Sequence, residues 1–320
     1  MVNITSPRFE GDHVLEACYE GETYLSLGSR GDSVRKIQEV LVDAGYPLPR
    51  ADGIFGRETN IAVKMFQRVS RFRGKDVDGK IGPKTMNLLD TKLGKTPLKW
   101  AEYLKEGLSK LSSTPPGFPF GGWKYDTRYW EEDESDPYYR AYKPVSGVVP
   151  SIAVKKIFVN LDKWDIDCAI FPELALLYAY LYAMGDVEFD IQFQDLRLRQ
   201  HETTGIERQF YDIDDTDKAT FNEIWKNSPT GTKVMWTNRS PATVSTAWHN
   251  ENALKSSKGT YWQDDLYDAH PLGSNLSEEI VIERLSTSAG DFPENGSEAE
   301  KNYYIRNNIY RHQLHLIIFP

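Results

Sequence analysis

Cysteines are few, positive charge is in deficit and no long apolar run occurs in this 320-residue sequence. The two cysteines, Cys18 and Cys168, exclude a disulfide framework, because a framework needs several pairs. The 38 basic and 47 acidic residues give a net charge of -9, which offers no general attraction to nucleic-acid phosphates or anionic lipid. We therefore expect no nucleic acid and no membrane among its partners.

A secretory signal is also missing from the sequence as it stands. The first residues, MVNITSPRFEGDHVLEACYEGETY, contain no basic segment followed by an apolar run. The most apolar stretch, 169–184, is interrupted by Pro172 and Glu173 and is too short to cross a bilayer. With 40% apolar and 27% charged residues, the chain is long enough to form two compact domains with apolar cores.

A near-repeat stands out against these absences: DGIFGRET at 52–59 and DGKIGPKT at 78–85. Each Asp-Gly pair predicts a tight turn, because Gly adopts positive φ and Asp bonds the backbone two residues on. Apolar residues at helical spacing predict helices at 34–44 and 60–69, and Pro83 suits the first turn of a third helix at 83–89. A three-helix unit is therefore expected at 21–92, after an N-terminal arm at 1–20.

The motifs of this unit resemble, in their order, the small helical peptidoglycan-binding domain of cell-wall enzymes. They are LGSRGDSV at 27–34, IQ at 37–38, AGY at 44–46, FQ at 66–67 and the two Asp-Gly repeats. The resemblance implies a shallow groove near the repeated loops that docks cell-wall glycopeptide without catalysis. The binding residues it implies are Asp52, Gly53, Phe55, Gly56, Asp78, Gly79 and Gly82.

Two alternatives for this unit stay open. The segment at 68–76, RVSRFRGKD, is more basic and longer than such domains usually carry, so another polymer or a partner protein could be the ligand. The Asp-Gly loops could also be turns without any binding role.

The segment at 93–150 changes character. A helix is expected near 98–108, and the proline and glycine cluster at 112–122 predicts a linker or a wandering loop that packs on the next domain. The acidic, aromatic run at 126–139 is interpreted as a solvated surface, with a cation site as the alternative.

An α+β domain is predicted for 151–320, in which a buried helix packs on a mostly antiparallel sheet. The apolar run from residue 169 predicts that helix. Alternating apolar residues at 187–193, continued at 196–198, predict a half-buried strand, and 232–236 predicts another. The segment at 155–160 fits a strand or a helix end, and 311–320 is strand-like.

Cys168 lies at the N-terminal edge of the predicted buried helix. Unpaired amides and the positive end of the helix dipole favour thiolate there, which suits a nucleophile. The alternative is a structural cysteine at the start of a core helix. The candidate bases are the six histidines, His13, His201, His249, His270, His312 and His315. The sequence HETTG at 201–205 lacks the second histidine of a zinc-protease helix, so we expect no metal and no cofactor.

A second resemblance covers about a third of the chain. The segments DCAIF at 167–171, GDVEFDIQF at 185–193, GTKVMWTN at 231–238, WHNEN at 248–252 and AHPLG at 269–273 resemble, in this order, bacterial spore-coat transglutaminases, the protein-glutamine gamma-glutamyltransferases. The family implies a papain-like, transglutaminase-like fold.

Position by position, this resemblance implies that Cys168 is the nucleophile, His270 the general base and acid, and Glu251 the group that orients the imidazole. Asp167 stands where the family has a glutamate, which leaves its own role open. His249 is the competing base, two residues from Glu251.

The leading hypothesis is a cell-wall-targeted cysteine acyltransferase, which takes a glutamine-containing protein or peptide as acyl donor and an amine as acceptor. With water as acceptor the same thioester gives deamidation. One alternative is a peptidoglycan amidase or endopeptidase that uses the same three residues. Another is a non-catalytic, wall-binding structural protein.

A wall enzyme without a Sec signal in this chain needs another explanation of its location. The expected location is secreted, periplasmic or at the cell wall, and delivery by a specialised secretion machine is one hypothesis. An antibacterial effector or toxin with a dedicated immunity protein would fit that route. A spore or intracellular location is the other reading.

Overall fold

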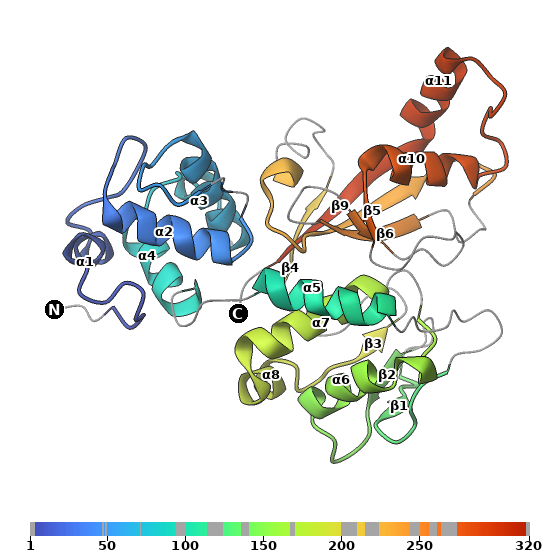
Figure 1. The fold of residues 1–320 in the computed structure, drawn as a ribbon, viewed down its shortest axis with the longest axis horizontal. Helices are drawn as coiled ribbons and strands as arrows, with labels where there is room; N and C mark the ends of the chain where they lie inside the picture. Colours follow the sequence, from blue (N-terminus) through green and yellow to red (C-terminus); the bar gives the residue numbers. More distant parts are fainter. Residues whose placement is uncertain are drawn as a thin grey trace.

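The computed structural model describes residues 4–46, 48, 50–70, 72–93, 100–113, 124–135, 141–166, 170–199, 210–214, 224–243, 250–255, 261–263 and 274–317. Within these ranges a helical N-terminal unit is followed by a larger α+β part (Figure 1). No helix in the described ranges has both the length and the apolar character needed to span a membrane. The α+β class expected from the sequence is confirmed.

The described residues of the N-terminal unit form the helices α1 (His13–Glu20), α2 (Asp32–Asp43), α3 (Arg57–Val69) and α4 (Pro83–Leu88). A 3-10 turn, η1 (Gly74–Asp76), precedes α4, and a π turn, η2 (Leu89–Leu93), follows it. The last three helices are those predicted from the sequence. Isolated bridges Leu25↔Ile81 and Arg30↔Ile54 join the loops between them.

The N-terminal arm is folded onto this unit and contains α1, which the sequence analysis did not anticipate. Asp12 caps α1 by accepting from the Leu15 amide at 3.2 Å. Ahead of the helix, the backbone amides of Thr5 and Ser6 donate to the buried carboxylate of Asp90 at 3.0 and 2.7 Å. The unit therefore begins well before residue 21.

The segment after residue 93 contributes a helix to the second part of the molecule. Helix α5 (Trp100–Ser113) lies along α7 (Ile170–Met184), and the Trp100 and Tyr180 rings are 4.6 Å apart. A Cβ at Gly107 would lie 3.0 Å from Cβ of Tyr178, so the glycine allows the two helices to approach closely. The helix expected near 98–108 is confirmed.

A small antiparallel sheet, β1-β2-β3, lies beside these helices. Its strands are β1 (Trp130–Glu132), β2 (Ala141–Pro144) and β3 (Leu198–Arg199). The acidic run is not wholly a solvated surface, because Asp126 and Asp133 are only 4% and 5% exposed. They bind Arg128 and Arg197, respectively, at 2.6 and 2.9 Å. The expectation of a solvated surface is wrong for these two residues.

The segment predicted as a strand at 187–193 is a helix, α8 (Asp186–Gln192), so that prediction is wrong. Phe189 and Phe193 are four residues apart, which places them on one helical face, and their rings stack at 4.4 Å in the core. Val187 and Ile191 are 77% and 61% exposed. The alternation was thus two helical faces, one buried and one exposed.

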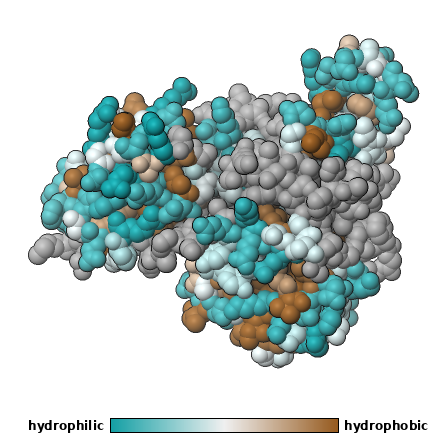
Figure 2. All heavy atoms as spheres, in the orientation of Figure 1, coloured by the Kyte–Doolittle hydropathy of each residue, from teal (hydrophilic) through white to brown (hydrophobic). Residues whose placement is uncertain are grey.

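Helix α8 packs against α6 (Pro150–Val159), which resolves the segment at 155–160 as a helix. Figure 2 shows apolar atoms gathered on the lower part of the molecule, in the region of these two helices. Of the continuation predicted at 196–198, Leu198 lies in strand β3, and both Leu196 and Leu198 are buried.

The larger sheet has the order β4-β9-β5-β6-β7-β8, and its neighbours pair antiparallel. The strands are β4 (Phe210–Asp214), β5 (Lys233–Asn238), β6 (Asn250–Lys255), β7 (Tyr261–Gln263), β8 (Ser274–Leu276) and β9 (Ile309–Ile317). Helices α10 (Glu278–Thr287) and α11 (Glu298–Asn308) come between β8 and β9. The strands predicted near 232–236 and 311–320 are confirmed as β5 and β9.

Helices cover both faces of this sheet. Lys233 and Asn238 are five residues apart in β5, so they lie on opposite faces. Lys233 binds Glu173 of α7, whereas Asn238 donates to the Leu285 carbonyl of α10 at 2.6 Å. Helix α7 is buried from Ile170 to Leu181, as expected for the predicted core helix.

Candidate functional site

Gln38, from helix α2, organises the first Asp-Gly loop. Its Nε2 donates to Asp52 Oδ1, the Ile54 carbonyl and Thr59 Oγ1 at 3.1, 3.0 and 3.0 Å. Its Oε1 accepts from the Gly53 amide at 2.8 Å. Asp52 Oδ1 also accepts from the Ile54 amide at 2.9 Å, which closes the turn.

Gln67, from helix α3, repeats the same network in the second loop. Its Nε2 donates to Asp78 Oδ1, the Lys80 carbonyl and Thr85 Oγ1 at 2.9, 3.1 and 3.1 Å. Its Oε1 accepts from the Gly79 amide at 2.9 Å. The near-repeat in the sequence is therefore a repeated structural joint, in which a glutamine from the preceding helix fastens an Asp-Gly turn to the start of the next helix.

This geometry gives several of the predicted binding residues a role in folding. Gly53 and Gly79 have φ of +72° and +75°, which favours glycine, and their amides are used by the glutamines. Phe55 is 1% exposed, so its ring belongs to the core. The contact of Asp52, Gly53, Phe55, Gly56, Asp78, Gly79 and Gly82 with a ligand remains a prediction.

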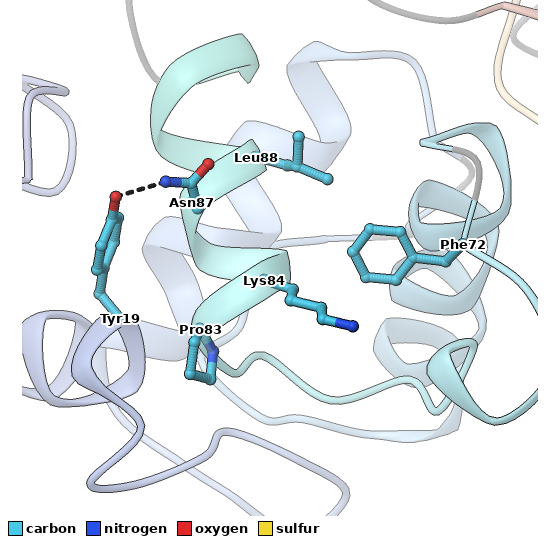
Figure 3. Close-up of a pocket in the computed structure, with 6 residues that line it drawn as sticks. All are labelled: Tyr19, Phe72, Pro83, Lys84, Asn87 and Leu88. Carbon is cyan, nitrogen blue, oxygen red and sulfur yellow. Dashed lines mark hydrogen bonds between the residues drawn. The ribbon is translucent and has the colours of Figure 1, made fainter.

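Two adjoining pockets open beside the second loop, and we name them together the α4 groove. One, of about 480 Å³, is lined by Tyr19, Phe72, Pro83, Lys84, Asn87 and Leu88 (Figure 3). The other, of about 300 Å³, shares Phe72, Pro83 and Lys84 and adds Tyr24, Gln67, Asp76, Asp78, Lys80, Gly82 and Thr85. Asp78 and Gly82 are the members of the predicted set that line it.

Aromatic rings and exposed charges define the chemistry of the α4 groove. Lys84 Nζ lies 3.2 Å from Asp76 Oδ2, in an exposed ion pair that a ligand can displace at little cost. Tyr24, which is 52% exposed, packs over Gly82. A Cβ at Gly82 would lie 2.3 Å from Cε1 of Tyr24, so this ring needs the glycine in order to form the wall.

Of the catalytic residues predicted from the sequence, Cys168, His270, Asp167 and His249 lie outside the described residues. Helix α7 is described from Ile170, two residues after Cys168 in the chain, so the predicted place of the thiol at the start of this helix stays a prediction. Glu251 lies in β6, where its backbone pairs with Trp236 of β5. Their mutual geometry therefore stays a prediction.

Between helix α7 and strand β5 the structure reveals an ion pair that the sequence analysis missed. Lys233 Nζ lies 2.7 Å from Glu173 Oε1, and the two side chains are 5% and 1% exposed. The one signal for it was Glu173 itself, an acidic residue inside the apolar run. Alternation along the paired strands also places the buried Asn252 on the Lys233 face of the sheet, toward α7.

The other cysteine is structural. Cys18 is a free thiol in α1 with no exposed surface, and burial raises its pKa. It therefore packs as a small apolar side chain.

Metal ligation finds no support in the described part of the chain. No three His, Cys, Asp or Glu side chains there are arranged to hold a metal ion. The HETTG segment at 201–205 lies outside the described residues.

Two family models match the chain in tandem. Residues 30–89 match the putative peptidoglycan binding domain, and residues 109–313 match protein-glutamine gamma-glutamyltransferase. The second match covers most of the chain. This protein therefore belongs to the protein-glutamine gamma-glutamyltransferase family, as a transglutaminase-like enzyme that carries a peptidoglycan-binding domain.

One curated relative matches a short stretch of the chain. The zinc D-Ala-D-Ala carboxypeptidase of Streptomyces albus G is 42% identical over 77 residues, which are 23% of this chain and 28% of that protein. The chain thus spans little more than a quarter of this curated relative.

Among solved structures, a transglutaminase from Geobacillus stearothermophilus is 14% identical, with a TM-score of 0.48, over 69% of this chain and 90% of that one. A fused Zn-dependent amidase/peptidase with a peptidoglycan-binding domain, from Clostridium acetobutylicum, is 28% identical, with a TM-score of 0.20, over 28% and 42%.

Proposed function

We propose that this protein is a cysteine acyltransferase that its N-terminal domain directs to the cell wall. The observation that supports this most is the tandem match of one chain to a peptidoglycan-binding family and a transglutaminase family. The α4 groove is the proposed docking site, where aromatic rings, Lys80 and Lys84 meet the sugars, peptide and carboxylates of the wall polymer.

In the proposed reaction the Cys168 thiolate attacks the side-chain carbonyl carbon of a glutamine. The C–N bond of the carboxamide then breaks, His270 gives its proton to the departing nitrogen, and ammonia leaves behind a thioester. An amine attacks the thioester carbonyl, His270 takes the proton of that amine, and the thiolate is released as an isopeptide bond forms. Water in place of the amine gives glutamate.

Glu251 is the proposed partner that orients His270 and stabilises its charged form. Asn252 is a rival for this role, because it lies on the sheet face that α7 covers. Glu251→Gln and Asn252→Ala separate the two: the variant that removes the orienting group lowers kcat by about 10²-fold or more, and the other stays within a few fold.

A peptidoglycan amidase or endopeptidase using the same residues is the alternative. It is favoured by the 77 residues of this chain that are similar to a carboxypeptidase whose name states a D-Ala-D-Ala substrate. A non-catalytic wall protein is the third hypothesis.

One experiment distinguishes the three. The protein and Cys168→Ala are incubated with purified sacculi, and separately with a glutamine-containing protein and a labelled primary amine. Amine incorporation with ammonia release, lost in Cys168→Ala, supports the transferase. Soluble muropeptides without incorporation support the hydrolase, and no Cys168-dependent product supports the binding protein.

Cell-wall association is the location that the N-terminal domain suggests. An effector delivered by a specialised secretion machine remains a proposal. Its test is a pull-down from the producing cell for an immunity protein that blocks the Cys168-dependent activity; an absence of self-protection in that cell contradicts the effector role.

A further inference from the structure

The buried ion pair between Glu173 and Lys233 plays no part in the reaction described above, although it lies at the start of the helix that follows Cys168. Glu173 occupies the first turn of α7, and Lys233 is the first residue of β5. Sixty residues separate them in the chain, and both side chains are almost fully buried. The pair therefore joins one end of α7 directly to the sheet.

Stability alone does not account for this pair. Burial of two charges costs several kcal/mol per ion, and their attraction repays that cost only when the geometry is good. Helix α7 is already secured by apolar burial from Ile170 to Leu181. Apolar residues of similar size would hold the helix as firmly, but they would not fix its distance and rotation as a directional ion pair does.

We infer that the Glu173–Lys233 ion pair is a positioning element of the catalytic centre. By fixing the start of α7 relative to β5 and β6, the pair also positions the thiol of Cys168, which comes two residues before Ile170 in the chain. The inference rests on the proposed role of Cys168 as nucleophile. Strand β5 pairs with β6 from Lys233↔Leu254 to Thr237↔Asn250. The same strand pair therefore carries the anchor and both candidates for the orienting residue.

The charges of Glu173 and Lys233 determine in which direction each substitution shifts thiolate formation at Cys168. Each cancels the other in the intact protein. Lys233→Met removes the cation that faces Glu173 in the first turn of α7, which opposes thiolate formation nearby, whereas Glu173→Gln removes the carboxylate that faces Lys233, which favours it. Two substitutions that break the same ion pair thus have opposite effects on the thiol, which a purely structural role would not produce.

Other ionisable residues near the pair stay the same in every variant. His315 of β9 is the backbone register partner of Lys233. Lys255, at the end of β6, donates to the Trp225 and Ser228 carbonyls at 2.7 and 2.6 Å. Their contribution is therefore the same in every variant.

The experiment measures alkylation of Cys168 by iodoacetamide against pH in the full-length protein, with peptide-resolved mass spectrometry to separate it from Cys18. The pH midpoint is expected to rise by about one unit in Lys233→Met, to fall by about one unit in Glu173→Gln and to return near the original value in the double variant. Lys233→Arg, which keeps the pair, stays near the original midpoint. Lys155→Met breaks an exposed pair with Asp186 and leaves the midpoint unchanged.

Turnover supplies the second readout. The double variant is neutral and is expected to fold, so its melting temperature stays close to that of the original protein. Its kcat falls at least about tenfold while KM changes little, because the nucleophile is no longer held in place. Shifts of the two single variants in the same direction, absent shifts, or an unchanged kcat in the double variant each overturn the inference.

Failure of the proposed function is a separate result. Alkylation needs no substrate, so the opposite shifts can be measured even in a protein without turnover. An original protein that reacts at Cys168 but transfers no acyl group contradicts the proposed function, while the shifts still decide whether the ion pair positions the thiol.

Discussion

At the scale of single residues, two glutamines hold the Asp-Gly turns of the N-terminal domain in place. Gln38 and Gln67 are almost fully buried, and each satisfies a turn carboxylate, a backbone carbonyl, a hydroxyl and a glycine amide. Buried polar groups left without partners are costly. Each Asp-Gly motif therefore depends on a glutamine in the helix that precedes it.

Gln67→Leu is therefore expected to destabilise the protein by about 2–3 kcal/mol, because the Gly79 amide and several acceptors lose their partner. Gln38→Leu should behave alike. Gln194→Leu, at an exposed position in the turn after α8, is the control and should change the unfolding free energy by less than about 0.5 kcal/mol. Chemical denaturation measures all three, and equal effects at buried and exposed glutamines would contradict the structural role.

Asp52 makes acid stability a further test at this scale. Hydrogen bonds from the Ile54 amide and the Gln38 side chain lower the pKa of its carboxyl group. A lowered pKa in the folded state contributes stability that is present above the ordinary pKa of about 4 and is lost as pH falls through the folded value. Asp52→Asn should lose less stability than the original protein over that range, and parallel pH profiles would contradict this assignment.

At the scale of elements, the joint before α4 shapes the groove. Gly56 and Gly82 occupy equivalent positions before α3 and α4, and both have negative φ. A Cβ at Gly82 would meet Tyr24, whereas one at Gly56 would meet the flexible end of Glu58 at 3.2 Å. The two joints are alike in backbone but differ in what they support.

Gly82→Ala is therefore expected to displace Tyr24 and to weaken binding to purified sacculi by about tenfold, whereas Gly56→Ala should bind normally. Co-sedimentation with sacculi measures both, with the unfolding midpoint as a check on folding. Equal binding of the two variants would place the docking site elsewhere.

The elements also show what the sequence could predict. Helices α2, α3 and α4 follow from strong periodicity and turn residues, and the second of the two repeated Asp-Gly turns lies beside the α4 groove. Helix α8 was missed because alternation over seven residues also fits two helical faces. The glutamine networks and the Glu173–Lys233 pair were missed because they join residues that only the folded chain brings together. For Cys168, His270 and Glu251 the sequence motifs carry the prediction.

At the scale of the whole molecule, the N-terminal domain contacts the α+β part directly. The Thr230 amide donates to the Gly45 carbonyl at 2.9 Å, just after the end of α2. Gly45 has φ of +82°, and a Cβ there would lie 3.2 Å from Cβ of Thr230. Thr230 precedes Gly231, whose amide bonds to Lys255 at the end of β6.

Gly45→Ala should therefore lower the unfolding free energy by about 1–2 kcal/mol from backbone strain and by more from the lost contact. Gly74→Ala is the matched control, because Gly74 has φ of +53° and nothing within 4 Å of the added Cβ. Equal losses in the two variants, measured by denaturation, would show that the contact contributes nothing to stability.

The central claim is that acyl chemistry passes through Cys168, and its most direct measurement is capture of the thioester. The full-length protein is mixed with a glutamine-containing peptide, quenched in acid and digested. The mass of the digestion product that contains Cys168 is then measured by mass spectrometry. The account predicts an adduct equal to the acyl donor minus ammonia on Cys168, released by hydroxylamine and absent from Cys18. Turnover without such an adduct, or turnover that survives in Cys168→Ala, would contradict it.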